Sequence, residues 1–255
     1  MKEWKLKKVI QILTACLAMI VVLNVSGISM KTMQTIDNKK ESKTNRRDSN
    51  LQMESETRET ISRILNEQIQ TELPQIAITF DDGPSVCTPA LLDGLKERGV
   101  KATFFLVGEN VETYPDIVKR IYEEGHLIGN HTYHHVEITK LSDEEAMYEI
   151  NKTDELIAAI TGQRVQYIRP PFGIWQRELE NYLDVLPVMW TVDPLDWTTE
   201  NIDEVVNKVV SQAKENDIIL LHDCYKSSVE AALRIVDLLK AEGFEFVTVD
   251  KLILE

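Results

Sequence analysis

The chain has 255 residues and a net charge of −14, with 42 acidic side chains against 28 basic ones. This length suits one large α/β domain with additions, because α/β barrels of about 250 residues commonly form a single unit. The first 60 residues carry 11 basic and 7 acidic side chains, and the remaining residues carry 17 and 35. The acidic body excludes binding of nucleic acid or anionic lipid through a broad surface, since both need a positive field.

Residues 1–29 are predicted to form a secretory signal or a membrane anchor. Four lysines among the first eight residues precede a mainly apolar run from Val9 to Ile28, and about 20 residues are enough to cross a bilayer. The basic flank should stay in the cytoplasm. The run is long for a cleaved signal, which favours an uncleaved anchor and places the rest of the chain outside the cytoplasm.

Residues 30–73 are predicted to form a polar linker that ends in a short helix. Met30 to about Thr60 is rich in Lys, Asn, Ser, Thr and Glu and lacks aromatic residues, so this part cannot bury enough apolar surface to offset chain entropy. Apolar residues then recur at helical spacing from Ile61 to Ile69. The folded domain is expected to comprise residues 74–255.

Strand and helix patterns alternate through this domain. Seven repeated βα units predict a parallel sheet and favour a (β/α) barrel over an open doubly wound sheet. The predicted strands are Gln75 to Phe80, Ala102 to Val107, His126 to Asn130, Val165 to Arg169, Val188 to Val192, Ile218 to His222 and Glu245 to Val249.

Several helices between the strands have recognisable beginnings and ends. Thr88 is predicted to cap a helix that has Pro89 at its first position. Ser142 and Glu145 predict a capping box before a long helix that reaches about residue 160, and Asn201 is predicted to start another helix. Glycines where a left-handed stop is easiest follow four predicted helices: Gly99, Gly125, Gly162 and Gly243.

Polar residues cluster after the predicted strands. In an α/β barrel the reactive groups gather at the carboxyl ends of the strands. Asp81 and Asp82 follow the first strand, where Gly83-Pro84 forces a turn, and a capped turn alone would explain them equally well. Further polar segments follow later strands: His131 to His135, Arg169 to Gly173, Asp193 to Trp197, and His222-Asp223.

Two histidines in these segments have spacing that suits a metal site. His131 and His135 are four residues apart, which in one helical turn places both rings on the same side. With one carboxylate they would form a three-ligand site with open positions, as hydrolytic zinc requires. The same set also describes the facial triad of non-haem iron oxygenases. His134 is expected to face solvent, and His126 is expected to be structural.

Five short motifs occur in order along the domain. They are Thr79-Phe80-Asp81-Asp82-Gly83, His131-Thr132-x-x-His135, Arg169-Pro170-Pro171-Phe172-Gly173, Asp193-x-x-Asp196-Trp197 and Leu220-Leu221-His222. Together they resemble the motifs of the polysaccharide deacetylase family, also called the NodB-homology family or carbohydrate esterase family 4. The resemblance covers about residues 75–249. It implies a distorted (β/α) barrel and metal-dependent removal of acetyl groups from N-acetylated sugars.

The resemblance also implies a role for each reacting group. Asp82, His131 and His135 would hold the metal, for which zinc is expected and cobalt, nickel and manganese are alternatives. Asp81 would be the general base that takes a proton from the attacking water. His222 would be the general acid that protonates the departing amine.

Other motif residues would support these groups. Arg169 would hold the base carboxylate, and Asp196 would orient the acid histidine. Trp197 would wall the acetyl pocket, and the backbone N–H near Phe172 would help to hold the oxyanion. Phe172 stands where many family members carry Tyr, but little loss is expected because the backbone carries the role. Asp193 belongs to its motif without an assigned role.

These residues predict an anchored or secreted enzyme that removes N-acetyl groups from N-acetylhexosamine in a cell-wall glycan, with peptidoglycan favoured. Chitooligosaccharides and O-acetyl esters such as xylan are alternative substrates, and a non-haem iron oxygenase and a non-catalytic wall-binding module are alternative classes. We expect a monomer whose partners are the acetylated glycan and, through its N-terminal segment, the membrane. Cys87 and Cys224 follow the first and last site-bearing strands, and a disulfide between them is left open.

Overall fold

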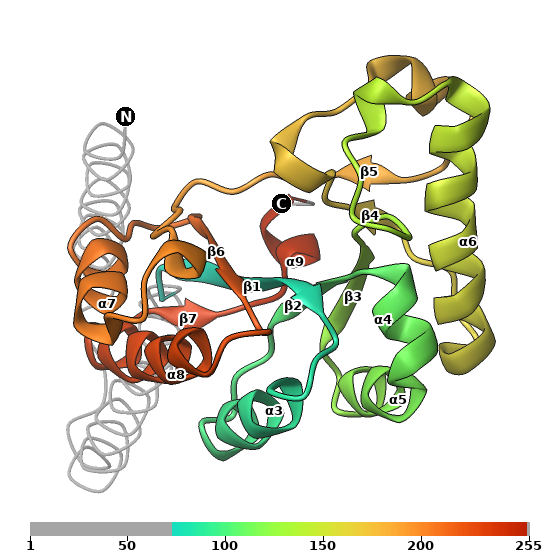
Figure 1. Cartoon of the computed structure of the whole chain (residues 1–255). Coiled ribbons are helices and arrows are strands. Elements are labelled where there is room, and N and C mark those ends of the chain that lie inside the picture. Colours follow the sequence, from blue (N-terminus) through green and yellow to red (C-terminus); the bar gives the residue numbers. More distant parts are fainter. Residues whose placement is uncertain (1–72, 254–255) are drawn as a thin grey trace, which may run out of the picture. The chain divides into compact units, whose positions relative to one another are not determined.

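The computed structural model of this chain describes residues 73–253 (Figure 1). The predicted signal or anchor, and all but the last residue of the predicted linker, lie outside these residues. Within residues 73–253, no helix is both long enough and apolar enough to cross a membrane.

Strands and helices alternate along the described chain, as the sequence pattern predicts. Short 3₁₀ turns occur at Ile138–Lys140, Pro171–Gly173, Arg177–Asn181 and Asp196–Thr198. The main elements, in chain order, are β1 (Gln75–Gly83), α3 (Thr88–Glu97), β2 (Thr103–Leu106), α4 (Gly108–Thr113), α5 (Pro115–Glu123), β3 (Leu127–Asn130), α6 (Asp143–Thr161), β4 (Tyr167–Ile168), β5 (Leu186–Pro187), α7 (Ile202–Val210), β6 (Ile218–His222), α8 (Lys226–Ala241), β7 (Glu245–Phe246) and α9 (Val249–Ile253).

The seven described strands form one parallel sheet, which confirms the predicted parallel α/β sheet of seven strands. The order is β5-β4-β3-β2-β1-β6, and β7 pairs with β1. Asp81 at the end of β1 lies opposite His222 at the end of β6. Residues 186–192 pair with β4 at their start, and further along Val192 bridges Ile219 of β6. This second pairing curves the sheet back towards β6, consistent with the expected distorted barrel.

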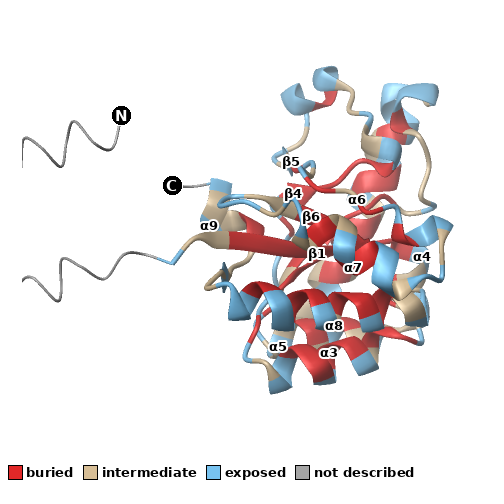
Figure 2. Cartoon of the chain, turned by 90° about the vertical axis from the view of Figure 1, so that its left-hand side faces the viewer, coloured by how far each residue is buried: buried red, intermediate tan, exposed pale blue. Residues whose placement is uncertain are grey.

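Strand β1 lies at the centre of the core because both of its faces are covered (Figure 2). Ile78 and Phe80 belong to the larger apolar cluster, which includes side chains of α3 and α8. Ala77 points the other way, into a second cluster with Phe105 and Tyr167. Burial on both faces is typical of parallel strands. It explains why β1 reads as a mostly apolar run, without polar alternation, up to Phe80.

The predicted starts of two helices are confirmed, and the predicted stop glycines have the expected backbone conformation. The Ser142 hydroxyl accepts the Glu145 N–H, and the Glu145 carboxylate accepts the Ser142 N–H, which completes the capping box of α6. The Asn201 side chain accepts the Glu204 N–H at the start of α7. The four predicted stop glycines all have positive φ angles, between 64° and 92°.

The predicted Thr88 cap is wrong. Cys87 is the N-cap of α3, and Thr88 is the first helical residue. The Thr88 hydroxyl instead accepts the Ser85 N–H at 2.7 Å and donates to the Asp223 carboxylate at 2.6 Å. The hydroxyl is therefore used to join the end of β1 to the end of β6.

The predicted fifth strand, Val188 to Val192, is also misplaced, because β5 covers only Leu186–Pro187. This segment changes hydrogen-bonding partner within a few residues, from β4 to β6. Neither partner therefore holds a long ladder there. The predicted strands around β4 and β7 shorten to two residues each.

Candidate active site

The carboxyl end of β1 brings two adjacent carboxylates to one site. Side chains of neighbouring residues in a regular strand point to opposite faces. Here the register between β1 and β2 shifts between Phe80 and Gly83, and Asp82 has a left-handed φ of 68°. The irregularity allows both Asp81 and Asp82 to face the same cavity.

Asp82, His131 and His135 lie together as the motifs predict. The Asp82 Oδ1 atom is 3.5 Å from His131 Nε2 and 3.3 Å from His135 Nε2. His131 Nδ1 lies 2.6 Å from the Arg169 carbonyl oxygen, and this bond makes Nδ1 the donor and leaves the Nε2 lone pair towards Asp82. Among the described residues, these three form the cluster of potential metal ligands.

The chemistry of this donor set fits a divalent cation. Asp82 Oδ1 is buried and has no hydrogen-bond partner, which is costly for a carboxylate oxygen unless a cation neutralises it. Burial works against the ionised form, but the neighbouring histidines, His131 above all, outweigh it and lower the pKa of Asp82 overall. Burial and the adjacent His131 lower the pKa of His135. Both shifts favour the deprotonated forms that bind metal.

The backbone that carries the histidines differs from the predicted helical turn. Residues 131–135 form a loop, and Thr132 and His135 have left-handed φ angles of 63° and 53°. The ring centroids of His131 and His135 are 4.9 Å apart because the chain bends at these residues. The expectation that His134 faces solvent is only partly right. Its side chain is half-exposed, but Nδ1 lies 2.6 Å from Glu149 Oε1.

Arg169 fixes the carboxylate of Asp81. Its guanidinium is fully buried and donates to Asp81 Oδ1 at 2.8 Å and to the Thr79 hydroxyl at 2.6 Å. The same group donates to the Val188 carbonyl oxygen and lies 4.2 Å from the centre of the Phe105 ring. These contacts hold Asp81 with its other oxygen, Oδ2, near the metal-ligand cluster.

Asp196 holds His222 through two hydrogen bonds. Asp196 Oδ1 is 2.8 Å from His222 Nδ1, and Oδ2 accepts the His222 backbone N–H at 2.9 Å. Burial of His222 opposes its protonated form. The hydrogen bond and charge of Asp196, with the charges of Asp81 and Asp82, outweigh it and raise the pKa of His222 to about 9. His222 is therefore protonated at neutral pH and can donate a proton.

One open cavity of about 330 Å³ unites the predicted residues. The cluster of potential metal ligands, Asp81 and His222 all line it. Phe172 and Trp197, the predicted substrate contacts, also line it, and their side chains are 62% and 56% exposed. Exposed aromatic side chains around a polar centre are suited to packing against a sugar ring.

The motifs missed several residues around this cavity. Trp190 and Tyr225 form part of its wall, and the Asn110 side chain donates to the Asp82 carbonyl oxygen at 2.8 Å. Asp193, a motif residue to which the sequence assigns no role, also lines the cavity, and its carboxylate accepts the Leu195 N–H at 2.8 Å in the turn before Asp196. Only aromaticity, and for Tyr225 its position after a strand, could have identified these two residues from the sequence.

Asp223 is a further missed residue, and it braces the end of β1. It is fully buried, accepts the Thr88 hydroxyl, and packs so closely on Gly83 that a Cβ atom there would lie 2.5 Å from Asp223 Oδ2. Burial raises the pKa of Asp223 to about 7. The turn that presents Asp82 therefore requires glycine at position 83.

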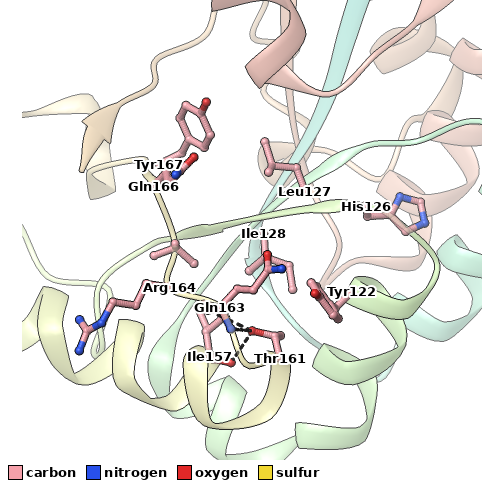
Figure 3. Close-up of a pocket in the computed structure, with 11 residues that line it drawn as sticks. Tyr122, His126, Leu127, Ile128, Ile157, Thr161, Gln163, Arg164, Gln166 and Tyr167 are labelled. Atoms are coloured by element: carbon pink, nitrogen blue, oxygen red, sulfur yellow. Dashed lines mark hydrogen bonds between the residues drawn. The ribbon is translucent and has the colours of Figure 1, made fainter. Parts of the chain in front are cut away.

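A second cavity, of about 240 Å³, lies at the opposite end of β3 from His131 (Figure 3). His126 is buried beside it and accepts the Ala102 N–H at 3.1 Å. Burial lowers the pKa of His126 to about 4, so the ring is neutral, which agrees with the predicted structural role. None of the predicted site residues lines this cavity.

Cys87 and Cys224 lie close together as free thiols. The Sγ atom of Cys87 is 3.7 Å from the carbonyl oxygen of Cys224. The two residues are therefore close together without a bond between them.

Comparison with known proteins gives a consistent family. The sequence profile described as polysaccharide deacetylase matches residues 68–189. A peptidoglycan-N-acetylglucosamine deacetylase of Bacillus cereus is 42% identical over 185 residues, which cover 68% of this chain and 66% of that protein. A chitooligosaccharide deacetylase of Azorhizobium caulinodans is 36% identical over 66% of this chain and 90% of that protein.

Solved structures agree with the sequence matches. The structure of the peptidoglycan deacetylase PdaC of Bacillus subtilis has a TM-score of 0.70 and 39% identity, covering 72% of this chain and 92% of that chain. The matched part of this chain spans 66% of the full B. cereus relative and 42% of full-length PdaC. With the five motifs gathered around one cavity, these matches show that the chain belongs to the polysaccharide deacetylase family.

Proposed function

We propose that this protein is a metal-dependent hydrolase that removes N-acetyl groups from N-acetylhexosamine residues of a cell-wall polysaccharide, with peptidoglycan as the substrate. The observation that carries the proposal is the shared cavity, which is lined by a three-ligand cluster, a carboxylate held by arginine and a histidine held by aspartate. A wall-binding module without catalysis has no need for this set. The relatives' names support the acetylated glycan as the substrate class.

Asp82, His131 and His135 would hold the cation, and zinc suits one carboxylate and two imidazoles. The chemistry that such a cation supplies when bound is a water of lowered pKa and a polarised acetamide carbonyl. Asp81 acts as the general base, because Arg169 fixes one oxygen and leaves the other near the ligand cluster. It takes the proton of the water that attacks the carbonyl carbon.

His222 completes the reaction from the neighbouring strand. An unprotonated amine is a poor leaving group, so breaking the C–N bond requires an acid. Asp196 keeps His222 protonated at neutral pH, and the ring lines the cavity opposite Asp81 on the paired strand. His222 gives its proton to the amine as acetate separates. The backbone N–H near Phe172 supports the developing oxyanion, and Trp197 walls the acetyl group.

The proposed domain organisation places this chemistry next to the wall. Residues 1–29 anchor or export the chain, residues 30–73 form the linker, and residues 74–255 form the catalytic domain. Such a tether would let a monomeric catalytic domain reach glycan strands beside the membrane.

The proposal is tested by measuring acetate release with zinc or cobalt from peptidoglycan, chitooligosaccharides and acetylated xylan. Peptidoglycan should release acetate, and mass spectrometry of the muropeptides should show glucosamine or muramic acid. No acetate from any N-acetylated glycan would refute the proposal. Oxygen uptake with ferrous iron would instead support the oxygenase that shares this ligand set.

Substitutions of Asp81 and Asp82 test the separate roles proposed for these two neighbours at the end of β1. Asp82→Ala should lose the metal, because it removes the carboxylate ligand. Asp81→Asn should retain the metal and lose turnover by about 10²-fold or more, the usual contribution of a general base. Metal content by atomic emission and acetate release measure the two effects separately. Equal acetate release by Asp81→Asn and wild type would show that Asp81 is not the base.

A further inference from the structure

Glu149 lies on the buried face of α6, outside all five motifs. The buried residues of this helix are Ala146, Glu149, Ile150, Thr153, Asp154 and Ile157. This spacing is that of one helix face. Glu149 is only 6% exposed, and a buried carboxylate must find donors.

Its donors come from the loop that carries both histidine ligands. Glu149 Oε2 accepts the backbone N–H groups of Tyr133 and His134 at 3.0 and 2.8 Å. Glu149 Oε1 lies 2.6 Å from His134 Nδ1. One carboxylate therefore binds the middle of the segment between His131 and His135 three times.

The carbonyl groups of the same loop are held from the other side. The first N–H of α4, from Gly108, donates to the Thr132 carbonyl oxygen at 2.9 Å, and the Glu109 N–H donates to the Tyr133 carbonyl oxygen at 3.1 Å. The loop is thus clamped between α4, which binds its carbonyl oxygens, and Glu149, which binds its N–H groups.

The loop backbone that these contacts hold is strained at two points. Thr132 and His135 both have left-handed φ angles, each of which is unfavourable for a residue with a Cβ atom. Such conformations persist when surrounding contacts over-determine them. A relaxed loop would move the ring of His135 relative to His131, because both rings depend on these backbone angles.

We propose that Glu149 is a positioning residue for the metal centre, which it serves by holding the backbone between His131 and His135. This inference rests on the proposed function, because it requires those histidines to bind a cation. Glu149 touches neither the ligand cluster nor the cavity. Its effect should therefore appear in metal affinity and coordination geometry before it appears in folding.

Asp154 provides a matched control on the same helix. It is also 6% exposed and also accepts a loop backbone N–H, that of Val165 at 2.9 Å, together with the Arg164 guanidinium at 2.6 Å. The loop that it holds carries no proposed ligand. Loss of a buried carboxylate from α6 is thus common to both positions, and only Glu149 is connected to the histidines.

The experiment measures zinc dissociation constants of the full-length protein by competition with a chelating dye, and the visible absorption spectrum of the cobalt-loaded protein. Glu149→Ala should weaken zinc binding about 10- to 100-fold, the usual cost of losing a group that orients metal ligands, and should alter the cobalt spectrum. Glu149→Gln keeps one oxygen for the two backbone N–H groups, so its affinity should lie between Glu149→Ala and wild type. Asp154→Asn should match wild type in both measurements.

Zinc affinity and a cobalt spectrum that are unchanged in Glu149→Ala would overturn the proposal, as would equal losses in Glu149→Ala and Asp154→Asn. If Glu149→Ala does not fold, Glu149→Gln carries the test, and the proposal fails if it is indistinguishable from Asp154→Asn. Failure of the proposed function has a different result, since wild type would then bind zinc no better than Asp82→Ala.

Discussion

Two histidine–carboxylate pairs in this protein have almost the same local geometry. The Nδ1–oxygen distance is 2.8 Å for His222 and Asp196, and 2.6 Å for His134 and Glu149. In both pairs the second carboxylate oxygen accepts the backbone N–H of the histidine itself.

The surroundings of the two pairs differ. The His222 side chain is 13% exposed and lines the cavity beside Asp81, whereas that of His134 is 47% exposed and lies outside this cavity. The first pair therefore presents a protonated ring to the cavity. In the second, the carboxylate also accepts the Tyr133 N–H, so it holds two successive residues of the loop and not the histidine alone. A histidine–carboxylate contact therefore does not by itself define a catalytic pair, because the surroundings of the ring decide whether it can reach a substrate.

The largest expected difference between the two pairs is in kcat after each histidine is replaced by alanine. His222→Ala should lower kcat about 10²- to 10⁴-fold, the usual range for a lost general acid, with zinc affinity close to wild type. His134→Ala should lower kcat by no more than about fivefold, because exposed pairs contribute little and both backbone bonds to Glu149 persist. Acetate release from peptidoglycan checks both variants. Comparable losses in the two variants would contradict the assignment of His222 alone as the acid.

Neutralising Asp196 should shift the dependence of kcat on pH. The reaction needs protonated His222, so kcat should fall as the pH rises through the pKa of this group. Asp196 raises that pKa, and the charge-neutral Asp196→Asn should therefore move the falling alkaline limb to lower pH, by about 1 to 3 units. The measurement is kcat between about pH 6 and 10. An alkaline limb that stays in place would show that another group sets it.

Much of the fold can be predicted from the sequence, because apolar runs identify the buried strands and capping residues identify where helices begin. Strand β6 has the predicted bounds, and β1 begins at the predicted residue, since long apolar runs are buried in the sheet. The start of α6 follows directly from Ser142 and Glu145. The position of β5 was not readable, because residues 186–192 divide their hydrogen bonds between two partners that local sequence does not specify.

The site, like the fold, has a part that the sequence predicts and a part that it does not. Asp81, Asp82, His131, Arg169 and the other motif residues come together because they follow strands whose carboxyl ends meet at one edge of the sheet. Glu149 was missed because its main partners are backbone N–H groups, which have no sequence signal. Its position on the apolar face of α6 is the signal that was available, since a carboxylate there must be paired.

The smallest expected effect is a difference in how the two pairs contribute to stability as the pH changes. His222 has a folded-state pKa of about 9, above the value of about 6.5 for an unfolded histidine. Its contribution is therefore fully present below about pH 6.5 and is lost as the pH rises through about 9. In metal-free protein, the melting temperature of wild type relative to His222→Ala should decrease by a few degrees across this range.

The hydrogen bond to Glu149 also raises the pKa of His134, so the melting temperature of wild type relative to His134→Ala should also decrease as the pH rises. The change should be smaller, because solvent screens the half-exposed ring. Thermal melts in chelator at several pH values measure both differences, and a wild-type advantage over His222→Ala that grows with pH would contradict the stabilising role assigned to protonated His222.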